Sequence, residues 1–241
     1  MQEVLGYMRR AITDYNLIEN GDKIAVAISG GKDSLILLKG LAMLRQFIGI
    51  DYEIMGITLD PCFDGKNGDY TAVKSLCDEY NIEYIVKRTN IAEVVFDIRK
   101  EKNPCSLCAR LRRGILHSTA KAHGCNKIAL GHHRDDAIET FIMNLFNEGR
   151  IANFSPKSYL SRKDLTMIRP LCYTPEKAVR RAMRRTNLKV VKSPCPVDKT
   201  TNREKTKQFI SAMDAQDRGF SIKVFGAFKK GLVDWQTPDG R

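Results

Sequence analysis

The sequence has 241 residues, 43% of them hydrophobic, with seven cysteines and a formal net charge of +12. This length suffices for one large domain with a substantial core, and no apolar run approaches the ~18 residues that span a bilayer. The odd cysteine count argues against a disulfide framework, so we expect a soluble, cytoplasmic protein without membrane contact.

The positive charge is concentrated in one part of the chain. Residues 1–149 hold 19 Lys and Arg against 20 Asp and Glu, whereas residues 150–241 hold 21 against 8. Such a segregated excess is typical of a surface that binds a polyanion, because each neutralised phosphate releases counterions. A solvated helix face that keeps the protein in solution is the plainer interpretation of a charge run. The segregation favours nucleic acid as the partner.

Short apolar runs alternate with longer helical stretches in the first 150 residues. Apolar residues already recur at helical spacing near the N-terminus. Four later runs have the length and composition of strands: residues 23–28, 52–59, 82–87 and 126–131. Strands separated by helices form βαβ units, which predicts an α/β fold with a doubly wound parallel sheet.

The pattern changes after Arg150. The stretch "NFSPKSYLSRKD" reads as a loop, and amphipathic helices are predicted at 175–186 and near 200–216. We therefore expect a nucleotide-binding core at residues 1–150 and a small, basic, mainly helical C-terminal region at 151–241 that contacts the polyanion.

The first chemical motif is "SGGKDS", which follows the first predicted strand and enters a helix. Backbone N–H groups and the helix dipole favour an anion at such a junction, and adjacent glycines let phosphate approach the backbone. A Gly-Gly turn with a polar helix cap is the purely structural interpretation. The motif is not a Walker loop, which needs glycine where Val26 stands, and the chain has no G-x-G-x-x-G.

The second motif is "NPCSLCARLRRG", with Cys105 and Cys108 just before an apolar and basic helix. A Cys-x-x-Cys pair indicates metal or redox chemistry, but a closed zinc site needs four ligands and no second pair is present. Cys195, in "KSPCPVD", is the best distant partner, and three thiolates fit an iron–sulfur cluster with one open iron. The remaining cysteines are expected to be buried free thiols: Cys62, Cys77, Cys125 and Cys172.

The third motif is "IALGHHRDDAIET", in which a strand ends at Gly131 and a helix follows Asp135 and Asp136. Paired carboxylates at the carboxyl edge of a parallel sheet hold Mg²⁺ that bridges nucleotide phosphates. Helix capping, worth about 1 kcal/mol per residue, is the alternative explanation. For His132 and His133, packing or hydrogen bonding explains the residues as well as catalysis does.

Together, "SGGKDS", "CSLCARLRRG", "GHHRDD" and "IRPLCY" resemble, in order and spacing, the motifs of the tRNA 2-thiocytidine synthetase family, which belongs to the PP-loop ATP pyrophosphatases. The resemblance implies a tRNA sulfurtransferase. ATP would adenylate the C2 oxygen of a tRNA base, most simply cytidine, and sulfur would replace AMP. It implies ATP, Mg²⁺ and a [4Fe-4S] cluster as cofactors. The implied partners are tRNA and a sulfur donor such as a cysteine desulfurase or free sulfide, and a homodimer is compatible with them.

The resemblance also implies roles for individual residues. Lys32, Arg112 and Asp135 would be catalytic, with Asp135 linked to Mg²⁺, and Cys105, Cys108 and Cys195 would hold the cluster. The nucleotide would be bound by Ser29, Gly30, Gly31, Lys32, Asp33, Ser34, Asp60 and Gly131. Arg112 stands where thiouridine-forming relatives have a catalytic lysine, and arginine stabilises charge but does not act as a base.

Three alternatives stay open at this point. One is a 2-thiouridine synthetase, although the paired cysteines of that group's flanking zinc fingers are absent. Another is an adenylating ligase of the lysidine-synthetase type with a zinc-stapled core. The third is a non-catalytic iron–sulfur or nucleic-acid-binding protein that keeps the loop as a relic.

Overall fold

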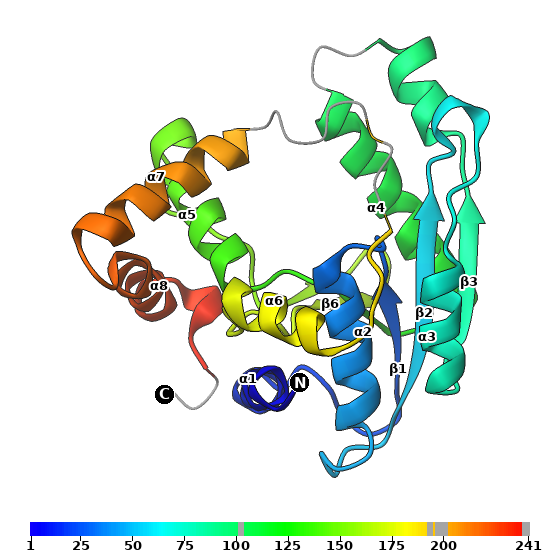
Figure 1. Cartoon of the computed structure of the whole chain (residues 1–241), viewed down its shortest axis with the longest axis horizontal. Helices are drawn as coiled ribbons and strands as arrows, with labels where there is room; N and C mark the ends of the chain where they lie inside the picture. Colours follow the sequence, from blue (N-terminus) through cyan, green and yellow to red (C-terminus); the bar gives the residue numbers. More distant parts are fainter. Residues whose placement is uncertain (101–103, 192–194, 196–201, 238–241) are drawn as a thin grey trace.

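The structure, a computed structural model, describes residues 1–100, 104–191, 195 and 202–237. Its centre is a six-stranded sheet of order β3-β2-β1-β4-β6-β5 (Figure 1), in which β5 is antiparallel to β6 and the other pairings are parallel. The strands are β1 (Asp22–Ala27), β2 (Tyr52–Asp60), β3 (Glu83–Arg88), β4 (Lys127–Ala129), β5 (Lys157–Leu160) and β6 (Leu165–Ile168). The predicted α/β fold with a mostly parallel sheet is confirmed.

Helices connect the strands and extend the chain beyond the sheet. They are α1 (Gln2–Asp14), α2 (Lys32–Leu44), α3 (Thr71–Glu79), α4 (Pro104–Ala122), α5 (Arg134–Glu148), α6 (Glu176–Arg185), α7 (Asn202–Gln216) and α8 (Phe220–Gly231). Shorter turns are η1 (Phe63–Gly65), η2 (Glu93–Ile98, a π-helix) and η3 (Val233–Trp235). In the described part of the chain, no helix is both long enough and apolar enough to cross a membrane.

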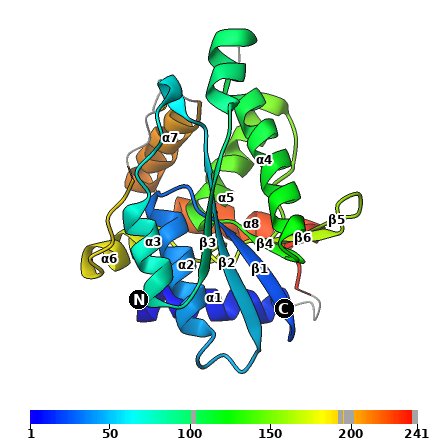
Figure 2. The same ribbon diagram turned by 90° about the vertical axis from the view of Figure 1, so that its right-hand side faces the viewer.

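The two faces of the sheet are covered unequally. Ile24 and Val26 of β1 belong to the larger core cluster, which includes apolar residues of α1, α2, α3 and α6. Ala25 points to the opposite face, where it joins Met55, Ile57 and apolar residues of α4 in a smaller cluster. Figure 2 shows α4 standing on this second face and extending past the carboxyl ends of the strands. The thinly covered second face is where the cavity described below lies.

The C-terminal helices are attached to the core through Trp235, which is fully buried. Its indole N–H donates to the Phe154 carbonyl at 2.8 Å, and the Tyr15 hydroxyl donates to the Trp235 carbonyl at 2.9 Å. Helices α7 and α8 pack against α5. The last described turn is therefore fixed to the end of α1 and to the segment before β5.

The four predicted strands and the helix predicted at 175–186 agree with the structure within a few residues. The predicted loop after Arg150 is wrong in part, because Lys157–Leu160 forms β5 in a hairpin with β6. Its half-exposed, polar edge strand gave no clear apolar alternation. Residues 200 and 201 of the second predicted helix lie outside the described residues. The division at residue 150 stays a prediction, and the sheet contains strands from both sides of it.

Candidate active site

The "SGGKDS" loop connects β1 to α2 and is held by its own serines. The Ser29 N–H lies 3.3 Å from Ser34 Oγ, the Gly31 N–H donates to Ser29 Oγ at 3.2 Å, and Ser34 Oγ donates to the Gly31 carbonyl at 2.9 Å. Gly30 has a φ of 81°, in the left-handed region that glycine adopts without strain. The loop is therefore preformed at the N-terminus of α2, where a phosphate is favoured.

The β4–α5 connection lies directly against this loop. A Cβ on Gly131 would be 3.1 Å from the Ser34 backbone nitrogen, so only glycine fits without displacement. Strand β1 has β2 on one side and β4 on the other, which makes the junction a topological switch point. Ligands of open α/β sheets bind outside the carboxyl ends of the strands at such a point.

Lys32 is held by two carboxylates. Its ammonium lies 3.0 Å from Asp33 Oδ2 and 3.1 Å from Glu176 Oε1. Burial alone lowers the pKa of Lys32, but the two carboxylates outweigh it and the pKa is raised. Lys32 therefore stays charged, as a phosphate ligand must.

Glu176, at the start of α6, receives two further cations. Arg180 and Lys207 each donate to it at 2.9 Å. Burial opposes ionisation of this carboxyl, but its hydrogen bonds to Lys207, Arg180 and Lys32 hold its pKa at about 2. A single buried carboxylate thus connects the loop to α6 and α7.

The predicted aspartates of α5 have hydrogen-bonding roles in the structure. Asp135 Oδ2 accepts the Glu176 backbone N–H at 2.8 Å, at the first turn of α6. Asp136 forms a reciprocal capping box with His133, the arrangement foreseen as the alternative to metal binding. Asp33 Oδ1, in contrast, is buried without a hydrogen-bond partner in the described structure. Carboxylate oxygens of Asp33 and Asp135 are of the kind that Mg²⁺ prefers, and Asp135 as a magnesium ligand stays a prediction.

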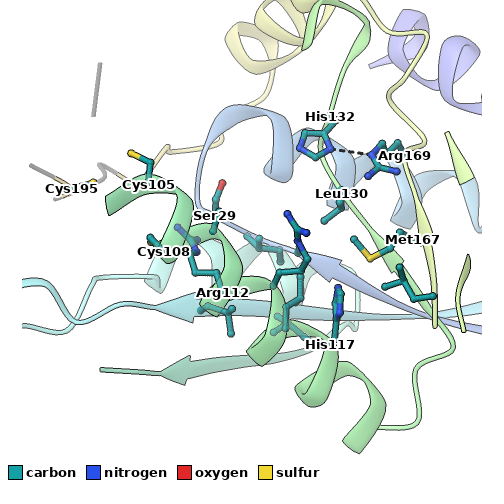
Figure 3. A pocket seen from close by; sticks show the side chains of 18 of the residues that line it. Ser29, Cys105, Cys108, Arg112, His117, Leu130, His132, Met167, Arg169 and Cys195 are labelled. Carbon is teal, nitrogen blue, oxygen red and sulfur yellow. Dashed lines mark hydrogen bonds between the residues drawn. The ribbon is translucent and has the colours of Figure 1, made fainter. Parts of the chain in front are cut away.

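A cavity of about 700 Å³ opens between α4 and the second face of the sheet, at the carboxyl ends of the strands. Its floor is apolar, with Ile57, Leu59 and Met167 among the lining residues. Ser29 of the loop reaches it, and so do Arg112 and the predicted cluster cysteines (Figure 3). The structure therefore brings the nucleotide loop and the cysteine motif to one cavity.

The cysteines at the cavity come from two distant segments. Cys105 and Cys108 are in the first turns of α4, and Cys195 follows a segment that crosses the loop. In that segment the Val191 N–H donates to the Gly30 carbonyl at 3.0 Å. Burial raises the pKa of Cys108, Arg112 beside it lowers the pKa, and Cys195 and Cys105 raise it further. These couplings show that the thiols and the guanidinium share one environment.

The donor set at the cavity, three cysteine thiols, fits an iron–sulfur cluster. None of the three cysteines is in a disulfide. Within the described residues, no three His, Cys, Asp or Glu side chains are grouped closely enough to hold one metal ion. The ligands of a four-iron cluster bind different irons, and three thiols that line one cavity are donors of the kind such a cluster takes.

Two residues of the cavity wall were not assigned a role from the sequence. His132 Nδ1 accepts a hydrogen bond from Arg169 Nε at 3.2 Å, and the imidazole stacks on Phe154 with a ring separation of 5.1 Å. Burial, with Arg169 next, lowers the pKa of His132 to about 4. The motifs "GHHRDD" and "IRPLCY" contain these residues, but nothing in either string indicates that the two meet.

Two other predicted positions lie in or before the loop that follows β2, and the binding role of Asp60 stays a prediction. Asp60 ends β2 but does not line the cavity, and its carboxylate accepts the backbone N–H groups of Cys62 at 3.0 Å and Gly68 at 2.8 Å. Its hydrogen bonds shape the loop after β2. Cys77, Cys125 and Cys172 are buried as expected, whereas Cys62 is half-exposed in that loop, so the expectation of a buried thiol is wrong there.

Comparison with known proteins identifies the family to which the chain belongs. A PP-loop domain model matches residues 7–212. The tRNA-cytidine(32) 2-sulfurtransferase of Syntrophotalea carbinolica is 40% identical over 207 residues, covering 85% of this chain and 79% of that protein. The corresponding protein of Geobacter metallireducens is 40% identical over 189 residues, covering 78% and 73%.

Among solved structures, the U34-tRNA thiolase NcsA from Methanococcus maripaludis with its [4Fe-4S] cluster is similar, with a TM-score of 0.77 and 25% identity. The match covers 96% of this chain and 78% of that one. The resemblance drawn from the sequence motifs is confirmed. The chain belongs to the PP-loop proteins and, among them, to the tRNA-cytidine(32) 2-sulfurtransferase family.

Proposed function

We propose that this protein is an ATP-dependent tRNA sulfurtransferase that converts a cytidine to 2-thiocytidine. The observation that supports this most directly is the meeting of Ser29, Arg112 and the three predicted cluster cysteines at one cavity. Activation of an oxygen and delivery of sulfur must act on the same base, so both sets of groups have to reach one place. The curated relatives, named as cytidine sulfurtransferases, support the same reaction.

In this reaction the loop residues bind the pyrophosphate part of ATP. Lys32 stabilises charge on the phosphates, and Mg²⁺ bound by Asp135 would add to it. The C2 oxygen of the base forms a bond to the α-phosphorus while the bond to the β-phosphate oxygen breaks, and pyrophosphate leaves. Arg112, fixed on α4 beside Cys108, stabilises the negative charge of the adenylate.

Cys105, Cys108 and Cys195 would hold the [4Fe-4S] cluster. When bound through three thiolates, such a cluster has one iron free to carry the sulfur that replaces AMP. The protein's part is to bring the three thiols and Arg112 to one cavity. A cysteine desulfurase or free sulfide as the sulfur source, and a homodimer as the working form, remain predictions.

The tRNA would lie across the basic C-terminal region. Arg180, Arg181, Arg184 and Arg185 are exposed on α6, the helix that Glu176 joins to the nucleotide loop. The target base has to leave its stack to enter the cavity, as bases do in enzymes that modify them. A tRNA substrate and ATP consumption also favour the cytoplasm as the compartment.

The test is a reconstituted reaction. Protein purified without oxygen is incubated with ATP, Mg²⁺, sulfide and unmodified tRNA, and the nucleosides are analysed by mass spectrometry. We expect 2-thiocytidine together with AMP and pyrophosphate. Omission of tRNA should stop pyrophosphate release, and thiolation by iron-free protein would contradict the role of the cluster.

A further inference from the structure

We propose that Glu176 is a positioning residue of the reaction, which holds Lys32 in the nucleotide loop and makes ATP and tRNA oppose each other's binding through Arg180 and Lys207. This inference rests on the proposed function, because it concerns how that reaction takes up and holds its two substrates. Neither the sequence motifs nor the names of the relatives assign a role to Glu176.

The carboxylate of Glu176 is shared by cations from three helices. Its Oε1 lies 3.1 Å from Lys32 Nζ of α2 and 2.9 Å from Arg180 Nη2 of α6, and its Oε2 lies 2.9 Å from Lys207 Nζ of α7. Figure 1 shows α6 beside α2. Asp33, the second carboxylate on Lys32, belongs to the same turn of α2. Glu176 is therefore the group that connects Lys32 to the basic helices.

Glu176 is fixed more firmly than its three partners. It is 9% exposed, and its backbone N–H donates to Asp135 Oδ2 at 2.8 Å. The side chains of Lys32, Lys207 and Arg180 are 30%, 40% and 54% exposed. The cations can therefore turn toward an incoming phosphate, whereas the carboxylate stays in place.

The carboxylate needs a cationic partner in every state of the enzyme. Its hydrogen bonds to Lys207, Arg180 and Lys32 hold its pKa at about 2, so it is ionised at neutral pH. An ionised group that is buried without a partner is strongly destabilising. When one cation leaves Glu176, the others are consequently held more tightly.

ATP binding removes one of these cations. The pyrophosphate part of ATP attracts Lys32 by charge-assisted hydrogen bonds, which leaves Arg180 as the remaining donor to Oε1. Repulsion between the two cations on that oxygen is then relieved, and Arg180 and Lys207 move closer to the carboxylate. Phosphates of tRNA have to draw on the same two side chains, so bound ATP weakens the binding of tRNA. Linkage requires tRNA to weaken ATP binding by the same factor.

The exchange has a consequence for the order of events in the reaction. The hold on tRNA is loosest while ATP is bound, when the target base has to leave its stack and enter the cavity. Departure of pyrophosphate returns Lys32 to Glu176 and releases Arg180 and Lys207 to the tRNA phosphates. The tRNA is therefore held most firmly while the adenylated base awaits sulfur.

The test measures binding of both ligands to protein purified without oxygen. The probes are α,β-methylene-ATP with Mg²⁺, which is not cleaved between the α- and β-phosphates, and an unmodified tRNA transcript. Filter binding gives the Kd of tRNA with and without saturating analogue, and calorimetry gives the Kd of the analogue with and without saturating tRNA. We expect each ligand to raise the Kd of the other by the same factor, about 5–20-fold. Salt at about 0.15 M screens repulsion between exposed charges more than about 8 Å apart.

Glu176→Gln removes the charge and keeps the size of the side chain. The mutual effect of the ligands should fall below about twofold, and the analogue should bind more tightly than to the wild type, because no carboxylate competes for Lys32. A merely structural role would weaken the binding of the analogue. Glu79→Gln, which removes an exposed charge paired with Lys39, is the control and should keep the mutual effect.

Lys207→Ala tests the other end of the exchange. It should weaken tRNA binding and reduce the mutual effect, because one of the two shared cations is gone. Lys205→Ala, at an exposed position of the same helix, should keep the mutual effect. Circular dichroism and iron content check that the variants are folded.

Independent or mutually favourable binding of the two ligands to the wild type would overturn the inference and leave the proposed function in place. So would an undiminished mutual effect in Glu176→Gln or in Lys207→Ala. Wild-type protein that bound neither the ATP analogue nor tRNA would instead contradict the proposed function itself.

Discussion

The ammonium of Lys32 lies 3.1 Å from the carboxylate of Glu176, which joins the nucleotide loop to the first turn of α6. The same carboxylate binds Arg180 of α6 and Lys207 of α7. A pyrophosphate that enters the loop competes with Glu176 for Lys32. Because α6 and α7 also carry the basic charge expected to contact tRNA, nucleotide and tRNA binding would, under the proposed function, act on the same ion pairs.

Replacing Lys32 with alanine should abolish thiolation and leave the fold intact. The lysine neutralises phosphate charge in the reaction, and loss of one such group costs about 100-fold or more in rate. Activity is measured as 2-thiocytidine formed, and iron content and circular dichroism report on cluster and fold. Lys74→Ala, which removes an exposed ion pair with Asp78 on α3, is the control and should behave as wild type. Retained thiolation in Lys32→Ala would refute the assignment of the loop.

Glu176 should make the stability of the protein sensitive to acid. Its pKa falls from the usual 4.5 to about 2 in the folded protein, so its contribution is present above pH 4.5 and is lost as the pH falls toward 2. Glu176→Gln should lower the free energy of unfolding at pH 7 by about 1–3 kcal/mol. The deficit should shrink toward pH 3. Urea unfolding at several pH values measures this, with the exposed Glu79→Gln as control, and a deficit independent of pH would contradict the prediction.

The arginines of α6 divide into two pairs. Arg181 binds Glu3 at 2.7 Å and Arg180 binds Glu176, whereas Arg184 and Arg185 lie exposed in the last turn. Arg184→Ala with Arg185→Ala should weaken tRNA binding and reduce the slope of log K against log salt. The reduction should be about 0.7–0.9 for each phosphate that the variant no longer neutralises.

The matched change at Arg180 and Arg181 should alter the slope less, since these side chains already neutralise carboxylates of the protein. Filter binding at several salt concentrations gives both slopes. If neither double variant changes the slope, α6 is an ordinary solvated helix.

Gly30 should be required for the close packing of Val191 against the loop, as well as for phosphate binding. A Cβ at Gly30 would lie 2.6 Å from the Val191 Cβ, and the backbone there has a φ of 81°. Gly49 has a φ of 75° and open space around it, so it provides a matched control. Gly49→Ala introduces the same backbone strain, about 1–2 kcal/mol, but no contact with a neighbouring side chain. We expect Gly30→Ala to lose iron as well as activity, whereas Gly49→Ala loses only stability. Equal iron content in the two variants would contradict this.

Much of the fold was predictable because its signals are local. Apolar periodicity predicts the four strands from 23–28 to 126–131 and the helix at 175–186. The glycines of the loop at 29–34, and its position between a strand and a helix, predict that loop. The edge hairpin of β5 was missed because a short, polar strand gives no alternation to read.

The missed parts of the site depend on contacts between distant segments. Glu176 meets Lys32 across 144 positions of sequence, and His132 meets Arg169 across 37. Periodicity and motif spacing carry no information about such pairs. Asp60 ends a strand as its predicted role requires, but its carboxylate hydrogen-bonds the loop that follows, so its part in nucleotide binding stays a prediction.

The last prediction concerns Cys195, which lines the cavity and is four residues beyond Val191, whose N–H donates to the nucleotide loop. Cys195→Ser should lose the cluster and thiolation, because serine is a poor ligand for iron in a thiolate site. It should still bind ATP, because the loop at 29–34 is formed by β1 and α2. The wild-type protein purified without oxygen should contain about four irons per chain, and air should inactivate it because an open iron is readily lost. Cys172→Ser, at a fully buried thiol away from the cavity, should keep its iron. Wild-type protein that bound one zinc and thiolated tRNA without iron would overturn the cluster assignment and leave the three cysteines as sulfur carriers.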